Sequence, residues 1–185
     1  YTAQTITIKA NNQRDVFSGD KPIVSNLATI TGLSNGVEVA SYNCVIKEEL
    51  NVYKVGAYVI DVTDIIFTAY SNGVKVEISF ADLKANMNVE VKTGTFTITQ
   101  LAGFIKAKDE EKKMDGVPLK ATNNCTTSLD ESKFDIFVIT SGMQSSIGSS
   151  EHVLEEYIIY YNGVDVTDCF NLKVANGTLT VSKPR

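Results

Sequence analysis

The chain has 185 residues, of which 43% are hydrophobic and 21% are charged, so it has the composition of a folded globular protein. This length allows one large domain or two small ones. A formal net charge of −5 argues against a nucleic-acid partner, because phosphate backbones are bound by clustered Lys and Arg. No apolar run approaches the roughly 18 residues of a membrane-spanning helix, so we expect no membrane span in this segment.

β-branched residues dominate the composition. The chain contains 20 Val, 16 Ile and 18 Thr, whose side chains lose little rotamer freedom in a sheet and more in a helix. This excess excludes an all-helical fold and predicts an all-β fold. The chain begins with Tyr1 and contains no signal peptide, so we expect it to be a piece of a longer polypeptide.

Alternating polar and apolar residues predict short strands along the whole chain. In the first half, the expected strands cover 5–8, 23–30, 37–46, 57–62, 65–70, 74–80 and 95–99. In the second half, they cover 104–107, 119–123, 134–140, 157–161, 170–174 and 178–181. Asn72-Gly73 and Asn162-Gly163 lie between strand-like runs, where Asn-Gly favours a type I′ turn because both residues accept a positive φ.

Two segments have some helical character. Residues 106–113 are too polar to bury one face of a helix, and we expect the charged part, 109–113, to be a solvated segment. Glu151 to Tyr161 has apolar residues at helical spacing. Its Ile- and Tyr-rich end and the Asn-Gly after it favour a strand.

An internal repeat divides the chain. Residues 89–99 align without gaps on residues 172–182, and Gly94 matches Gly177 within this alignment. Each glycine precedes a strand-like run. We expect both glycines to occupy a turn or bulge that needs a positive φ.

Further landmarks recur in the same order. Ile8-Lys9-Ala10 aligns with Ile105-Lys106-Ala107, and nine residues after each Ile comes Phe17-Ser18-Gly19 or Met114-Asp115-Gly116. The Asn-Gly turns follow in both halves. These matches predict two modules, residues 1–100 and 101–185, joined near Gln100.

Short strands at even spacing, without long helices, are typical of sandwiches and barrels. We therefore predict two tandem immunoglobulin-like β-sandwich modules. A β-grasp-like arrangement of each module is the alternative, and a helix over residues 151–161 would favour it.

The motifs of the second module lie at residues 114–119, 141–150, 162–167 and 176–181, and the first module matches them mainly at 17–19, 54–58 and 94–99. With these motifs the chain resembles the tandem β-rich repeats, of the MBG or YDG type, of bacterial cell-surface adhesin-like proteins. The usual Tyr-Asp-Gly of that family is Met114-Asp115-Gly116 here.

This resemblance implies a non-enzymatic, extracellular structural or adhesive module of the cell surface or cell wall. Such a module acts as a spacer or as a host- or matrix-binding segment. The implied partners are neighbouring repeat modules of the same chain and host or extracellular glycans or proteins. No cofactor is implied.

Three tyrosines, Tyr157, Tyr160 and Tyr161, are the candidate ligand-binding residues. Each offers a flat apolar ring and a hydroxyl group. Strand alternation places Tyr157 and Tyr161 on one face and Tyr160 on the other, so at least one should be partly exposed. These residues underlie the alternative function, a carbohydrate-binding module of a secreted glycan-degrading protein, against which the absence of Trp counts.

No catalytic or metal site is predicted. His152 is the only imidazole, and because no Gly-x-Ser-x-Gly flanks a serine, we expect a surface histidine in a polar loop. Asp61-Val62-Thr63-Asp64 and Asp165-Val166-Thr167-Asp168 lack the dense oxygen-ligand spacing of a calcium loop.

The three cysteines are too widely spaced for a metal pattern. We expect Cys44, Cys125 and Cys169 to be small buried side chains. A Cys125–Cys169 disulfide is an open alternative, because the sequence does not give the distance between their Cα atoms.

Overall fold

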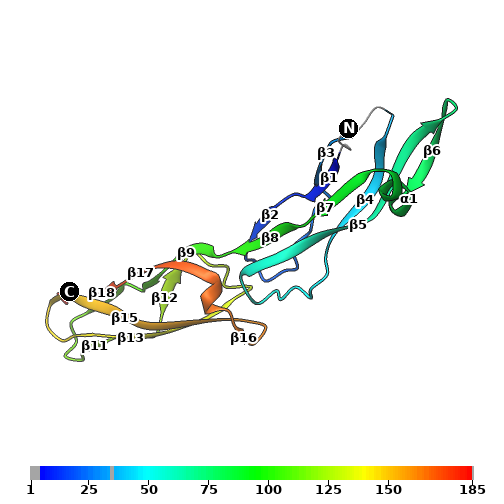
Figure 1. Ribbon diagram of the computed structural model, residues 1–185. Helices are drawn as coiled ribbons and strands as arrows, with labels where there is room; N and C mark the ends of the chain where they lie inside the picture. The colour runs from blue at the N-terminus through cyan, green and yellow to red at the C-terminus, as the bar shows by residue number, and fades with distance from the viewer. Residues whose placement is uncertain (1–4, 34–35, 185) are drawn as a thin grey trace. The chain divides into compact units, whose positions relative to one another are not determined.

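The computed structural model of the chain describes residues 5–33 and 36–184. Residues 1–4, 34, 35 and 185, which fall within the predicted modules, lie outside the described residues. The chain forms two compact units, each built almost entirely from strands (Figure 1). Unit 1 comprises residues 1–16 and 20–99, whereas unit 2 comprises residues 17–19 and 100–185.

Unit 1 contains eight strands among its described residues: β1 (Thr5–Ala10), β2 (Gln13–Val16), β3 (Ala28–Thr31), β4 (Glu38–Ile46), β5 (Gly56–Ser71), β6 (Val74–Ser79), β7 (Asn88–Lys92) and β8 (Gly94–Thr99). One sheet has the order β3-β1-β7, and the other has the order β2-β8-β5-β4 with β6 paired to β5. A short helix, α1 (Phe80–Asn86), separates β6 from β7. The Ser79 hydroxyl accepts a hydrogen bond from the backbone N–H of Asp82 and so caps this helix.

Unit 2 contains β9 (Leu101–Ala107), β10 (Glu110–Lys113), β11 (Leu119–Lys120), β12 (Cys125–Thr127), β13 (Asp135–Ser141), β14 (Met143–Gln144), β15 (Gly148–Tyr161), β16 (Val164–Asp165), β17 (Phe170–Ala175) and β18 (Gly177–Ser182). Its two larger sheets have the orders β12-β9-β17 and β10-β18-β15-β13, with β16 paired to β15. Strands β11 and β14 form a small extra pair. A single 3-10 turn, η1 (Thr167–Cys169), stands where unit 1 has α1.

The two units have the same order of strands in their sheets. The first strand of each unit pairs in parallel with its penultimate strand, β1 with β7 and β9 with β17. The second strand pairs in parallel with the last strand, β2 with β8 and β10 with β18. The registers also match, because Gly94 lies opposite Ile60 in β5 and Gly177 lies opposite His152 in β15.

The core of each unit consists of alternate side chains from both sheets, as half-buried strands require. In unit 1, Ile6 and Ile8 of β1 are fully buried together with Ile60 of β5. In unit 2, Ile105 of β9 and Leu179 of β18 are fully buried. Each core is thus built around matching strands.

Gly94 and Gly177 serve a different purpose from the one predicted. Neither has a positive φ, and each is the first residue of its unit's last strand. A Cβ atom on Gly94 would lie 2.4 Å from the carbonyl oxygen of Ala10, and one on Gly177 would lie within 2.1 Å of that of Ala107. The expected positive φ is therefore wrong: both positions need glycine because a backbone carbonyl occupies the space of a side chain.

Most predicted strands are present, with changed limits. The expected strands 57–62 and 65–70 are one strand, β5, while the expected strand 23–30 begins only at Ala28. Residues 151–161 belong to strand β15, which confirms the preference for a strand there. Both Asn-Gly turns have positive φ at both residues, 51° and 78° in the first and 48° and 78° in the second, as type I′ turns require.

Two segments form secondary structure that was not predicted. Helix α1 was not expected, because the strand-like run 74–80 gave no sign that a capped helix begins at its end. The charged run 109–113 was expected to be a solvated segment, but Glu110–Lys113 forms β10. This edge strand pairs on one side with β18, so charged side chains can face the solvent while the backbone is hydrogen-bonded.

The chain is all-β, with a sandwich-like organisation of several sheets, as predicted. Each unit mixes parallel and antiparallel pairs. The immunoglobulin-like topology named in the prediction is built from antiparallel sheets, so that finer assignment stays a prediction.

Candidate functional site

The most distinctive site lies where residues of the first sequence repeat enter the core of unit 2. Strand β2 ends at Val16, and the next three residues, Phe17–Gly19, are part of unit 2. The Phe17 side chain is only 2% exposed. Its ring centroid lies 5.4 Å from that of Phe170 and 6.1 Å from that of Phe134.

The rings around Phe17 contact one another as well. Phe134 and Phe170 meet edge to face at 5.1 Å, and Phe134 meets Tyr161 at 5.6 Å. Aromatic pairs in such arrangements contribute about 0.5–1.5 kcal/mol each beyond the area they bury. We call Phe134, Tyr161 and Phe170 the aromatic socket.

Three separate turns of unit 2 bring the socket together. Phe134 directly precedes β13, where its backbone N–H donates to the Asp130 carbonyl. Tyr161 is the last residue of β15, and Phe170 is the first residue of β17. The socket is thus formed by strand ends that the fold places side by side.

Gly19 fits the socket only because it lacks a side chain. It has a φ of +82°, and a Cβ atom there would lie 2.5 Å from Cε2 of Tyr161. The ammonium group of Lys133 lies 5.6 Å from the centroid of the Tyr161 ring and 5.9 Å from that of Phe134. Glycine and the phenylalanine two residues before it are therefore both needed for this packing.

Part of this site was visible in the sequence. The alignment of Phe17-Ser18-Gly19 with Met114-Asp115-Gly116 showed that an apolar residue and a glycine recur at this point. It could not show that the segment belongs to the core of the second unit, because Phe17 and Phe170 are far apart in sequence.

The three candidate tyrosines are divided between two environments. All three are half-buried. Tyr161 belongs to the socket, whereas Tyr160 lies on the opposite face of β15, where its ring meets that of Phe137 edge to face at 5.8 Å. Tyr157 shares the face of the fully buried Ile159. Tyr157 and Tyr161 thus share one face of β15, and Tyr160 lies on the other.

Tyr160 nevertheless lies on an apolar surface. Phe137 and Ile139 of β13 are 61% and 54% exposed, and Ile158 of β15 is 40% exposed and lies opposite Phe137. We call Phe137, Ile139, Ile158 and Tyr160 the outer aromatic face. Exposed apolar residues that gather in one place are typical of contact surfaces.

His152 is not in a surface loop, so that prediction was wrong. It is a residue of β15 with no exposed surface. Its Nδ1 donates to the Lys108 carbonyl at 2.6 Å, and its Nε2 lies 2.9 Å from both the Thr122 carbonyl and the Thr140 hydroxyl oxygen. Strand alternation directs it inward, and the hydrogen bonds offset the loss of water around the ring.

The acidic motifs are used in local hydrogen bonds. Asp64 accepts a hydrogen bond from the Asn43 side chain, and Asp165 accepts from both the N–H and the hydroxyl of Thr167. The Thr167 bonds, from the hydroxyl first, lower the pKa of Asp165. Within the described residues, no three His, Cys, Asp or Glu side chains converge as a metal site would need.

All three cysteines are thiols. Cys44 and Cys169 are buried, and Cys125 is half-buried. Burial raises the pKa values of Cys44 and Cys125, which keeps both in the unreactive protonated form. The structure therefore does not contain the Cys125–Cys169 disulfide that the sequence left open.

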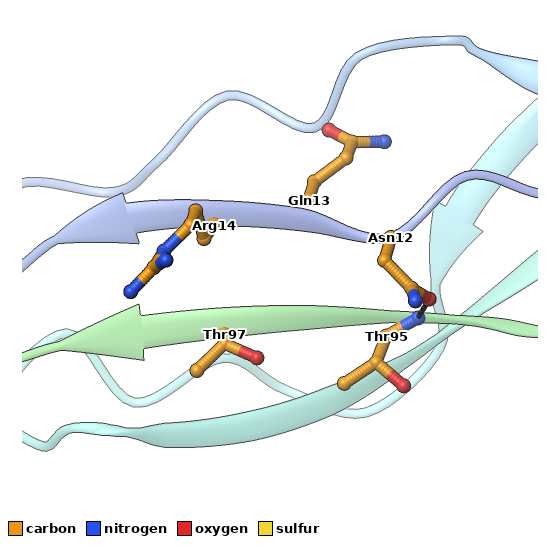
Figure 2. Close-up of a pocket in the computed structure, with 5 residues that line it drawn as sticks. All are labelled: Asn12, Gln13, Arg14, Thr95 and Thr97. Carbon is orange, nitrogen blue, oxygen red and sulfur yellow. Dashed lines mark hydrogen bonds between the residues drawn. The ribbon is translucent and has the colours of Figure 1, made fainter.

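A polar pocket of about 430 Å³ lies on unit 1 along β2 and β8, and Figure 2 shows its five lining residues. The Asn12 side chain accepts a hydrogen bond from the backbone N–H of Thr95. The Gln13 amide points to the other side of β2 and bonds the backbone of Ser25. The side-chain amides of Asn12 and Gln13 are thus used in bonds to the backbone, and the other lining residues are Arg14, Thr95 and Thr97.

The chain matches no protein-family model, no curated protein and no solved structure. In the part of the chain that the structure describes, no helix combines the length and the apolar character that crossing a membrane requires.

Proposed function

We propose that this chain is a non-enzymatic structural segment of an extracellular bacterial surface protein, in which repeated β-rich modules form a spacer. The observation that carries the proposal is the position of Phe17, a residue of the first repeat that lies within the core of unit 2. The surface location follows from the resemblance of the repeat motifs to those of cell-surface repeat proteins.

The Phe17 packing supports a role for the tandem arrangement itself. Removing a buried phenylalanine side chain costs about 3–5 kcal/mol, which is a large part of the stability of a small domain. Unit 2 thus depends on three residues, Phe17–Gly19, that belong to the first sequence repeat. This dependence suits modules that work as consecutive members of an array, where stability comes partly from neighbouring repeats.

The proposal is tested by mechanical unfolding of single chains together with a binding screen. A spacer should unfold in two force-resisting steps, one for each unit, and should bind no glycan or matrix protein tightly. Tight binding of one sugar or one protein, combined with unfolding at negligible force, would contradict the spacer role.

The surface location has its own test. Antibodies raised against the chain should label intact cells that produce the parent protein. Labelling that appears only after the cells are permeabilised would contradict an extracellular position.

Carbohydrate binding is the second candidate function, and the outer aromatic face favours it. The exposed Phe137 and the half-buried Tyr160 form an edge-to-face pair, which offers an apolar platform and a hydroxyl group. On a glycan array, Tyr160→Ala should abolish such binding, while Tyr58→Ala in unit 1 serves as the control. Binding that survives Tyr160→Ala would reject this site.

A further inference from the structure

The second sequence repeat carries its own copy of the segment Phe17–Gly19, which belongs to the first repeat but lies in unit 2. Met114–Gly116 follows the edge strand β10 just as Phe17–Gly19 follows β2. In both copies the glycine has a φ of +82°. The two segments therefore have the same position in the repeat and the same turn at their glycine.

The surroundings of the two copies differ. A Cβ atom on Gly19 would meet the Tyr161 ring at 2.5 Å, whereas one on Gly116 would have no atom within 4 Å. Phe17 is buried, but Met114 is half-buried, and Val117 is 60% exposed. The second copy thus has the shape of an inserted segment without the rings that surround the first.

Hydrogen bonds hold the second copy in this shape. The Met114 N–H donates to the Ser182 carbonyl, which extends the pairing of β10 with β18. The Asp115 carboxylate accepts from Lys112 Nζ at 2.7 Å and from the Val117 N–H at 2.9 Å. A segment that is already ordered loses little conformational entropy when it binds.

We infer that Met114–Gly116 inserts into the aromatic socket of a further module of the unit 2 kind, as Phe17–Gly19 inserts into unit 2. Each module would then complete the core of the next. This inference rests on the proposed function and names the partner of the array: a following copy of the same module.

The chemistry selects a unit 2 type of partner. The repeat positions of Tyr161 and Phe170 are occupied in unit 1 by Ser71 and Met87, so unit 1 lacks two of the three socket rings. The socket of unit 2 itself already holds Phe17. Methionine suits an aromatic socket because its flexible thioether makes favourable contacts with ring edges.

The first arm of the test uses the existing chain. The double substitution Phe17→Met with Ser18→Asp places the Met-Asp-Gly sequence in the unit 2 socket. Amide exchange in β13 and β15 reports the denaturation midpoint of unit 2. We expect this midpoint to fall less than half as far as it falls in Phe17→Ala. An equal or greater fall would overturn the inference, because Met-Asp-Gly would then not fit the socket.

The second arm adds a copy of residues 101–185 after Arg185 of the full chain. We expect the added copy to fold and the peroxide oxidation of Met114, followed by mass spectrometry, to slow several-fold as its side chain becomes buried. Met143, which is 54% exposed, provides the internal control and should oxidise at an unchanged rate. An unfolded added copy, or an unchanged Met114 rate, would overturn the inference.

These outcomes are separable from failure of the proposed function. Phe17→Ala could weaken unit 2 while Met114 stays reactive in the lengthened chain. The role of Phe17 in unit 2 would then stand, and only the insertion of Met114 into a further module would be rejected. If Phe17→Ala has no effect on unit 2, the basis of both proposals is lost.

Discussion

Unit 1 and unit 2 have the same strand order but fill matching positions with different chemistry. Ile60 and His152 lie opposite the equivalent glycines, Gly94 and Gly177, and both are fully buried. One site is filled by an apolar side chain, and the other by an imidazole that contacts two carbonyls and a hydroxyl. The comparison teaches that the shared fold depends on strand pairing and on the contact of each glycine with a backbone carbonyl. A single core position can hold an apolar side chain in one unit and a polar one in the other.

The same contrast holds at the start of the last strand. The backbone N–H of Thr95 donates to the Asn12 side chain in unit 1, and that of Thr178 donates to the Asp109 carboxylate in unit 2. The two hydrogen bonds have the same place in the repeat, but only the acceptor in unit 2, the Asp109 carboxylate, can lose its charge when the pH falls. At each such difference, a residue of one unit can be replaced by the equivalent residue of the other.

The largest expected effect comes from Phe17→Ala. Loss of the ring leaves a cavity in the aromatic socket, so unit 2 should lose about 3–5 kcal/mol of unfolding free energy. Amide hydrogen exchange should accelerate in β13 and β15 and remain unchanged in β4 and β5. Met114→Ala is the control, and in the chain as it stands it should cost much less because Met114 is half-buried.

The equivalent glycines should respond alike. Gly94→Ala and Gly177→Ala each force a methyl group against a backbone carbonyl, so each should destabilise its own unit by about 1–3 kcal/mol or more. Thermal unfolding followed by exchange in each unit measures the effect. Gly163→Ala is the control, since no atom lies within 4 Å of its added methyl group and only its φ of +78° opposes it. If either Gly94→Ala or Gly177→Ala left its unit as stable as before, the two glycines would not have the same role.

His152→Ile makes unit 2 resemble unit 1. The isoleucine would leave the Lys108 carbonyl without its hydrogen bond from Nδ1, so we expect a loss of about 1–3 kcal/mol in unit 2. Ile60→Val is the matched control and should cost about 0.5–1.5 kcal/mol in unit 1. A more stable His152→Ile variant in urea denaturation would show that the histidine is retained for something other than stability.

The smallest effect should be acid sensitivity. Hydrogen bonds from the Thr178 backbone and from Lys106 lower the pKa of Asp109 below its ordinary value of 3.8. A lowered pKa means that the charged form stabilises unit 2 above about pH 4 and that this contribution is lost as the pH falls through the lowered pKa. Asp115, Asp130 and Asp165 of unit 2 also have lowered pKa values, whereas Glu38 is the one such acid among the described residues of unit 1.

Unit 2 should therefore lose stability before unit 1 when the pH is lowered below 4. Asp109→Asn, which copies Asn12, should reduce this difference, and Asn12→Asp should add acid sensitivity to unit 1. Amide exchange in both units between pH 5 and pH 2.5 measures how much stability each unit loses. Equal sensitivity of the two units in the unaltered chain would contradict the assignment.

The sequence predicted the fold class and the positions of most strands, because alternation and Asn-Gly turns are local signals, but it did not predict how the strands pair in the sheets. It missed α1 and β10, since a serine cap at the end of a strand and a charged edge strand do not disturb the local pattern in a recognisable way. It also misplaced His152, because a polar side chain in a strand gives no sign of the carbonyls that surround it. The socket could not be predicted, since Phe17 meets Phe134 and Phe170 only through tertiary packing.

The central claim is that Phe17 lies within the core of unit 2, and nuclear Overhauser effects test it most directly. Ring protons of Phe17 should show cross-peaks to those of Phe170 and Phe134, whose centroids lie 5.4 Å and 6.1 Å away. These cross-peaks should be present in the folded chain and should disappear when unit 2 unfolds. A folded unit 2 whose Phe134 and Phe170 rings show no cross-peak to Phe17 would contradict the account.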